Sequence, residues 1–203
     1  MMKHFKQVAA FVMAMQLGIG AAHAAIVWDE AVDGDLSDDG AVPTALSVSP
    51  GENEWRGQVG DLGLPETDTD LVTFTVPDGL FLTSLRFDRY DESPDIGGGS
   101  FFAVAEGSAV STGFGSVHLS NALVDAPGEW LDDLADGARF GSPSAEVTGL
   151  TAPLPAGDYV VWLGELATQI DYTIVATLAV PEPTGLASLV ALLGVGSISY
   201  RRK

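Results

Sequence analysis

Apolar and polar residues alternate along much of the chain, and residues typical of turns separate the alternating segments. Every second residue is apolar in residues 71–76 and again in residues 169–178. This period of two predicts half-buried β-strands, because successive side chains of a strand point to opposite faces. Pro77-Asp78-Gly79 follows the first of these segments and predicts a tight turn, with proline fixing φ and glycine accepting a positive φ.

Further strands are expected at residues 25–28, 44–48, 54–59, 80–87, 100–105 and 159–163. Between the strands, one helical turn is indicated at residues 130–135. Eight or nine short strands with frequent turns predict an all-β fold. We therefore expect an antiparallel, jelly-roll-like β-sandwich, flanked by an N-terminal signal helix and a C-terminal hydrophobic helix.

The beginning of the chain has the pattern of a secretory signal. Lys3 and Lys6 make it basic, residues 8–22 carry no charge and are mostly apolar, and Ala22 and Ala24 form a small-x-small cleavage pattern. Signal peptidase is expected to cut after Ala24. The apolar run is shorter than the ~20 residues that a membrane-spanning helix needs, which argues against a permanent anchor here.

The end of the chain has three parts in order: the motif Val180-Pro181-Glu182-Pro183, the charge-free residues 184–200 and the basic cluster Arg201-Arg202-Lys203. Two prolines this close together end regular secondary structure. The following segment, as a helix, reaches about 25 Å, slightly less than the hydrocarbon core of a bilayer. The basic cluster is expected to stay on the cytoplasmic side of the membrane.

These three parts resemble the PEP-CTERM sorting signal of Gram-negative bacteria. The resemblance implies that an exosortase cuts the chain at or near the Pro-Glu-Pro motif after export through the inner membrane. The protein would then be anchored in the membrane only transiently and would reach the cell surface or an exopolysaccharide matrix. Such a sorting signal works like other C-terminal signals whose hydrophobic tail is removed from the mature protein. A permanent single-pass anchor is the alternative.

The chain thus divides into residues 1–24 as signal peptide, 25–179 as one β-sandwich domain and 180–203 as sorting signal. Between residues 25 and 180 there are 27 acidic and four basic residues, a net charge of −23. This charge argues against nucleic acid as a partner, because phosphate binding needs a positive surface. The chain has no cysteine, so disulfides, thiol nucleophiles and cysteine-ligated metals are excluded.

The middle of the chain carries a second resemblance, in three blocks: Gly34-Asp35-Leu36-Ser37, Phe74-Thr75-Val76-Pro77-Asp78-Gly79 and Leu154-Pro155-Ala156-Gly157-Asp158-Tyr159. In this order they look like the pre-peptidase C-terminal-like sandwich of many secreted bacterial proteins, over roughly residues 28 to 178. The resemblance implies an architecture and no particular reaction.

Acidic residues gather in two places that could supply a calcium site: Asp29, Glu30, Asp33 and Asp35 in the entry segment, and Asp68 and Asp70 just before the strand at residue 71. Hard oxygen ligands at alternating positions suit a Ca²⁺ ion with six to eight ligands. Sandwich domains of the second resemblance bind calcium in a comparable place in some secreted proteases. The alternative is a solvated acidic loop without a metal.

Catalysis is not expected. His118 lies beside Ser116 and Ser120, but the chain has no G-x-S-x-G motif, and we expect an exposed histidine in a loop or strand. The acids Asp91, Glu106, Glu129 and Glu165 could be nominated as glycosidase pairs. Carboxylates are so frequent in this chain that any such pair is uninformative.

Tryptophans offer a different function, the stacking of sugar rings. Trp55 and Trp130 have polar neighbours and are expected to be exposed, whereas Trp162 lies in an apolar run and is expected in the core. The sequence thus predicts an exported structural or adhesive protein of the surface or matrix. The alternatives are a carbohydrate-binding module for matrix exopolysaccharide, if Trp55 and Trp130 share an exposed surface, and, less favoured, a secreted hydrolase.

Overall fold

The computed structural model describes residues 23–60, 68–94, 99–112, 117–131, 146–147, 149–165 and 168–180. Several predicted features lie outside these residues: most of the helical turn at 130–135, both flanking helices, and the residues Ala22, Pro181, Glu182, Pro183, Arg201, Arg202 and Lys203. In the described parts of the chain, no helix combines the length and the apolar character that a membrane crossing requires.

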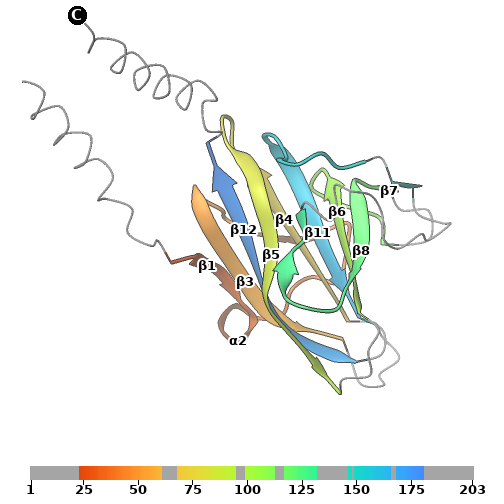
Figure 1. The fold of residues 1–203 in the computed structure, drawn as a ribbon. Coiled ribbons are helices and arrows are strands. Elements are labelled where there is room, and N and C mark those ends of the chain that lie inside the picture. The colour runs from red at the N-terminus through yellow and green to blue at the C-terminus, as the bar shows by residue number, and fades with distance from the viewer. Residues whose placement is uncertain are drawn as a thin grey trace, which may run out of the picture.

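Two five-stranded sheets pack face to face as a β-sandwich (Figure 1). Sheet A consists, in spatial order, of β1 Ala25–Asp29, β3 Gly51–Val59, β12 Gln169–Ala179, β5 Phe81–Ser93 and β9 Gly128–Glu129. Sheet B consists of β2 Thr44–Ala45, β4 Thr69–Val76, β11 Gly157–Gly164, β6 Ser100–Glu106 and β8 Ser120–Val124. The remaining elements are the short helix α2 Glu30–Asp33 and the strand pair β7 Val117–His118 and β10 Glu146–Val147.

The all-β sandwich is confirmed, but the sheets are mixed and not purely antiparallel. The edge strands β1 and β2 run parallel to their neighbours β3 and β4. In both cases the chain passes through the other sheet before it returns: β2 of sheet B lies between β1 and β3 in sequence, and β3 of sheet A lies between β2 and β4. A parallel pair requires such a long crossover, whereas a hairpin gives antiparallel strands.

The turn predicted at Pro77-Asp78-Gly79 is present and links the two sheets. It joins β4 of sheet B to β5 of sheet A. The backbone N–H of Leu80 donates to the carbonyl of Pro77 at 3.0 Å, and Gly79 has a φ of 81°. A positive φ is strained for residues that carry a Cβ. Gly79 therefore permits this turn, and with it the passage of the chain from sheet B to sheet A.

Aromatic side chains from both sheets meet in the core. Trp55 of sheet A lies 6.2 Å from Phe74 of sheet B, measured between ring centroids, and Phe74 lies 6.5 Å from Tyr159. Phe87 and Phe102 meet across the sheets at 5.1 Å in an edge-to-face arrangement. All five rings are buried. The sandwich is therefore closed by ring packing through its centre.

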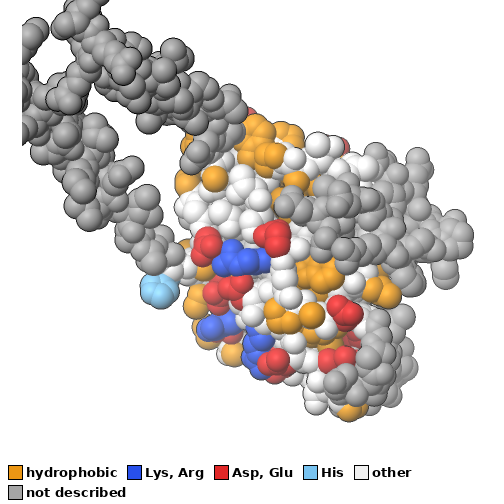
Figure 2. Space-filling model, viewed as in Figure 1, with side chains coloured by type: hydrophobic (Ala, Val, Ile, Leu, Met, Phe, Trp, Pro, Cys, Tyr) orange, Lys and Arg blue, Asp and Glu red, His pale blue; other side chains and the backbone are white. Residues whose placement is uncertain are grey.

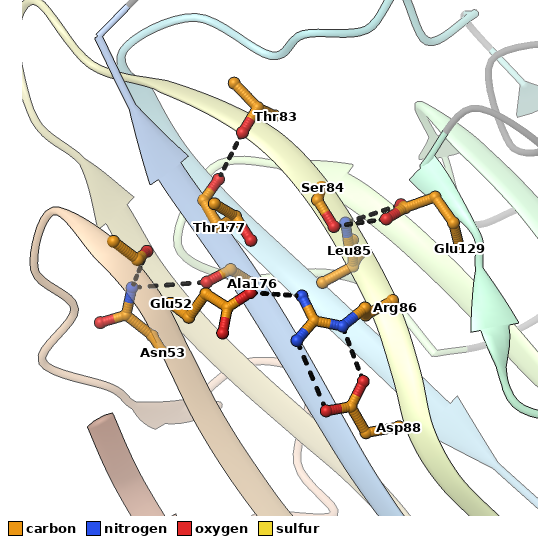
Figure 3. A network of polar contacts seen from close by, with 11 residues as sticks. Glu52, Asn53, Thr83, Ser84, Leu85, Arg86, Asp88, Glu129, Ala176 and Thr177 are labelled. Carbon is orange, nitrogen blue, oxygen red and sulfur yellow. Dashed lines mark hydrogen bonds and ion pairs between the residues drawn. The ribbon is translucent and has the colours of Figure 1, made fainter. Parts of the chain in front are cut away.

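The outer face of sheet A carries paired charges (Figure 2). Arg86 donates to Glu52 at 2.9 Å and to Asp88 at 2.6 Å, so it ties β5 to β3 across β12 (Figure 3). Two further arginines are paired in the same way: Arg56 with Asp29 and Glu54, and Arg89 with Asp91 and Asp171. Exposed pairs of this kind contribute about 0–1 kcal/mol each, so this face is a solvated exterior.

Candidate cation site

The entry segment folds back on itself directly after β1. Asp29 caps α2 and accepts the backbone N–H of Ala31 at 3.1 Å, while the Asp33 carboxylate accepts the N–H of Asp29 at 2.9 Å. Asp29 also accepts from Arg56 at 2.5 Å, and this hydrogen bond lowers the pKa of the Asp29 carboxyl. In the structure the two predicted metal ligands Asp29 and Asp33 thus hold the turn between β1 and α2 in place.

The short helix turns the Glu30 carboxylate toward strand β3. It accepts the backbone N–H of Gln58 at 2.7 Å and that of Leu36 at 3.2 Å. Gly57 makes this position possible, because a Cβ built on it would lie 2.3 Å from the Glu30 carboxyl carbon. Glu30 therefore occupies space that any other residue at position 57 would fill.

Asp70 approaches the same place from sheet B. It lies in β4 opposite Leu163 of β11, and it is only 3% exposed. Neither of its carboxylate oxygens has a partner with hydrogen-bond geometry. Leaving a buried polar group unsatisfied costs about 1–3 kcal/mol, and more for a charged group. The Tyr172 hydroxyl lies close enough to act against the burial that raises the pKa of Asp70, but it does not meet hydrogen-bond geometry. The buried Asp70 carboxylate therefore has no well-formed hydrogen bond among the described residues.

Glu30, Asp35 and Asp70 each place a carboxylate oxygen within 4.8 Å of the other two. Asp35 is exposed, Glu30 is half-buried and Asp70 is buried, so the cluster runs from the surface into the sandwich. Asp68 lies near enough to raise the pKa of both Glu30 and Asp70. Four of the six predicted ligands are thus in one neighbourhood, and three of them converge.

The electrostatics of the cluster oppose the ionised state of its members. Burial, followed by the negative charge of Glu30, raises the pKa of Asp70 to about 9. Burial is also the largest cause of the raised pKa of Glu30, although the N–H groups of Gln58 and Leu36 act against it. A cation bound between these carboxylates would remove their repulsion and stabilise the charged form of each.

Tyr172 approaches the cluster from sheet A, and nothing in its sequence context indicates this position. It lies on β12 opposite Gly57, it is 1% exposed, and its hydroxyl has no partner with hydrogen-bond geometry. Burial, followed by the charge of Asp70, raises its pKa well above the usual range. In the sequence Tyr172 is one more apolar position of an alternating strand, and only the packing of the two sheets brings it to Asp70.

The arrangement has the dimensions of a calcium site. Calcium–oxygen distances are about 2.3–2.6 Å, so two ligands of one ion lie at most about 5 Å apart. The three converging carboxylates satisfy this limit. All the donors are hard oxygens, as Ca²⁺ prefers, and the exposed side at Asp35 leaves room for water among the six to eight ligands.

The tryptophans predicted to be exposed are buried. Trp55 is 1% and Trp130 is 6% exposed, so they do not form a surface for a sugar. Trp162, predicted in the core, instead lies half-buried outside the main cluster. His118 was expected to be exposed but is only 1% exposed. For Trp55 and Trp162 the cause is the same, since the composition of the flanking residues was used where the face of the strand decides burial.

The four carboxylates considered as acid pairs lie on separate elements, with Asp91 on β5, Glu106 on β6, Glu129 on β9 and Glu165 directly after β11. Glu129 accepts the backbone N–H of Leu85 at 2.9 Å and is also bonded to the Ser84 hydroxyl, which fastens β9 to β5 (Figure 3). Glu165 accepts the hydroxyl of Ser100 at 2.9 Å. Both of these carboxylates hold the fold together.

No known family model matches this sequence, and none of the curated proteins is similar to it. The two resemblances given above therefore depend on the quoted motifs alone. The fold and the acidic cluster do not depend on these motifs, because they are observed in the positions of the residues.

The substitution Gly57→Ala is expected to abolish the response of the protein to Ca²⁺ while leaving it folded. The added Cβ would meet the end of a flexible side chain at 2.3 Å, so Glu30 moves away and the strand keeps its place. Calcium titration followed by tryptophan fluorescence, with Trp55 two residues away on β3, measures the effect. Gly128→Ala is the matched control, since its Cβ would lie 3.6 Å from the nearest atom outside its chain neighbours, the indole nitrogen of Trp130. Equal responses of the two variants would exclude Glu30 as a ligand.

Proposed function

We propose that this protein is an exported structural or adhesive component of the bacterial cell surface or extracellular matrix, sorted by an exosortase. One observation supports the proposal most. Strand β1 begins at Ala25, directly after the predicted signal cleavage at Ala24, and β12 ends at Ala179, directly before the motif that starts at Val180. Cleavage at both places would leave every strand of the two sheets intact.

In this proposal the two ends of the chain act in sequence. Signal peptidase releases the N-terminus, and the hydrophobic segment at 184–200 holds the protein in the inner membrane with Arg201 to Lys203 in the cytoplasm. Exosortase then cuts at or near the Pro-Glu-Pro motif and the tail is discarded. The mature product is a jelly-roll-like sandwich without catalytic activity. Val180 is 68% exposed, which suits access by a protease.

We further propose that the sandwich binds Ca²⁺ through Glu30, Asp35 and Asp70, with the Tyr172 hydroxyl beside them. The observation that favours it is the convergence of these three carboxylates around the buried Asp70, which has no well-formed hydrogen bond in the described residues. Outside the cell Ca²⁺ is plentiful, and extracellular modules bind it with dissociation constants of about 10⁻⁴ to 10⁻³ M. The ion would join the entry segment to both sheets of a protein that has no cysteine.

Mass spectrometry of the protein from the cell surface is expected to find an N-terminus at Ala25 and a C-terminus at or near the Pro-Glu-Pro motif. In cells without exosortase, and after substitution of both Pro181 and Pro183 by alanine, the chain is expected to keep Lys203 and stay in the membrane. Thr184→Ala, just outside the motif, is the matched control and should be processed normally. Surface protein that still ends at Lys203 in exosortase-containing cells would contradict the sorting proposal.

A further inference from the structure

The chain enters and leaves the two sheets at the same end of the sandwich. The register places Ala25, the first residue of β1, beside Asn53 of β3, and Asn53 beside Ala176 of β12. β12 ends three residues later, at Ala179, and Figure 1 shows it running to the upper end of the sandwich. β1 begins near that end, because it is parallel to β3 and therefore antiparallel to β12.

Three connections close this end, which we call the tail-side end: residues 47–50, 77–80 and 151–156. They lead into β3, β5 and β11. Asp78 is the charged residue among them. They also carry four exposed prolines, Pro50, Pro77, Pro153 and Pro155. Figure 2 shows apolar side chains gathered at this upper end of the body. The tail-side end is thus a surface of low charge in a strongly acidic protein.

The acidic residues gather toward the opposite end. The cluster of Glu30, Asp35 and Asp70 lies near the start of β4, and Asp38 accepts the backbone N–H of Thr69 there at 2.8 Å. Next to the tail-side end, β6 and β11 add one acidic residue each, Glu106 and Asp158. Because like charges repel, a membrane surface with anionic lipids favours the orientation in which the acidic cluster points away from it.

The tether between the sandwich and the hydrophobic segment is short. Four residues, 180–183, separate the end of β12 from the charge-free segment that begins at Thr184. A chain spans at most ~3.3–3.6 Å per residue, so four residues reach about 14 Å. The headgroup layer on one side of a bilayer is itself about 5–8 Å thick. The end of β12 is firmly held, because Leu178 is 1% exposed and is paired with both neighbouring strands.

We propose that the tail-side end lies on the lipid headgroups of the membrane for as long as the tail is attached, with the acidic cluster pointing away from the bilayer. This proposal rests on the proposed function for the membrane segment at 184–200, and it adds an orientation and a contact surface. The Pro-Glu-Pro motif then lies in the gap between the sandwich and the bilayer, where a membrane protease can reach it. The candidate cation site faces the surroundings of the cell.

Single cysteines test this orientation, because the chain has none of its own. Ala156→Cys and Ala126→Cys are a matched pair of exposed positions, the first at the tail-side end and the second two residues after β8. β8 ends opposite Ser100, the first residue of β6, so the two positions are about 26 Å apart along the strands.

The chain as signal peptidase leaves it, residues 25–203, is labelled with bimane at either cysteine. It is then reconstituted into vesicles of phosphatidylethanolamine and phosphatidylglycerol that carry a nitroxide on the lipid headgroup. Because a nitroxide quenches only at short range, bimane at position 156 is expected to be quenched at least threefold more strongly than bimane at position 126.

A longer tether is the control for this measurement. Twelve Gly and Ser residues inserted between Ala179 and Val180 leave the sorting motif intact and add a flexible spacer of about 19 Å, so quenching at position 156 should fall to the level at position 126. Flotation of the protein with the vesicles reports on the tail alone, and a protein that does not float contradicts the membrane-held state of the proposed function together with this orientation. If the protein floats but both labels are quenched equally, or if the insertion leaves the quenching at position 156 unchanged, the orientation is overturned while the membrane anchor stands.

Discussion

Millimolar Ca²⁺ is expected to raise the melting temperature of this protein, and EGTA is expected to reverse the rise. A ligand that binds the native state alone stabilises it by RT ln(1 + [L]/Kd). With a Kd of about 10⁻⁴ to 10⁻³ M, 10 mM Ca²⁺ adds about 2 kcal/mol, which for a domain of this size corresponds to about 4–8 °C. Thermal unfolding followed by circular dichroism measures the shift.

Two controls make this measurement specific. Mg²⁺ at the same ionic strength should shift the midpoint less, because it demands octahedral geometry at about 2.0–2.1 Å and releases its waters reluctantly. Asp35→Asn should reduce the Ca²⁺ effect, whereas Asp78→Asn should not, since Asp78 is exposed at the turn after β4 while Asp70 lies near the start of that strand. A midpoint that is the same in Ca²⁺ and EGTA would rule out the cation site.

The sequence was sufficient for the strands and the turn that depend on local patterns. Strands β4 and β12 and the turn at Pro77 lie where alternation and turn chemistry predicted them. Strands β3 and β5 extend further than predicted, to Gly51 and Ser93. The direction of the edge strands was not predictable, because a period of two shows which face of a strand is buried and not which neighbour it joins.

The exposure of Trp55 and Trp162 was predicted wrongly, although the same alternation of apolar and polar residues determines it. Trp55 lies between Glu54 and Arg56 and has Asn53 and Val59 on its own face of β3, both buried. Polar neighbours on both sides are what alternation gives a buried residue, so they were evidence for burial and not for exposure. In the apolar run around Trp162, the residues on either side face the core and direct Trp162 to the outer face of sheet B.

The sequence predicted which segments carry the acidic residues of the cluster, but not which of these residues converge in space. The sequence placed acids before β4 and around α2, and the fold brings Glu30, Asp35 and Asp70 together. It gave no means of separating these three from Asp29 and Asp33, because the capping of α2 by Asp29 and its pairing with Arg56 of the neighbouring strand β3 arise only in the folded chain. A site that is built across two sheets depends on contacts that no local pattern encodes.

The substitution Asp70→Asn is expected to stabilise the protein in EGTA at pH 8 and to remove its response to Ca²⁺. In the native state the Asp70 carboxyl has a pKa raised from 3.8 to about 9. Between these two values the native state holds a proton that the unfolded state has released, so the free energy of unfolding falls as pH rises. Asparagine keeps the shape of the side chain and carries no charge, which removes this dependence.

Chemical denaturation at pH 6, 7 and 8 measures the expected difference. A single group contributes at most about 1.4 kcal/mol per pH unit, and we expect about 1 kcal/mol per unit for the wild type in EGTA relative to Asp70→Asn. Saturating Ca²⁺ should flatten the wild-type dependence, because the ion replaces the proton as the partner of the carboxylate. Asp78→Asn, with the same chemical change on an exposed residue, should parallel the wild type. If Asp70→Asn has the wild-type slope in EGTA, Asp70 is not the protonated buried carboxyl. That result would contradict its proposed role as a cation ligand.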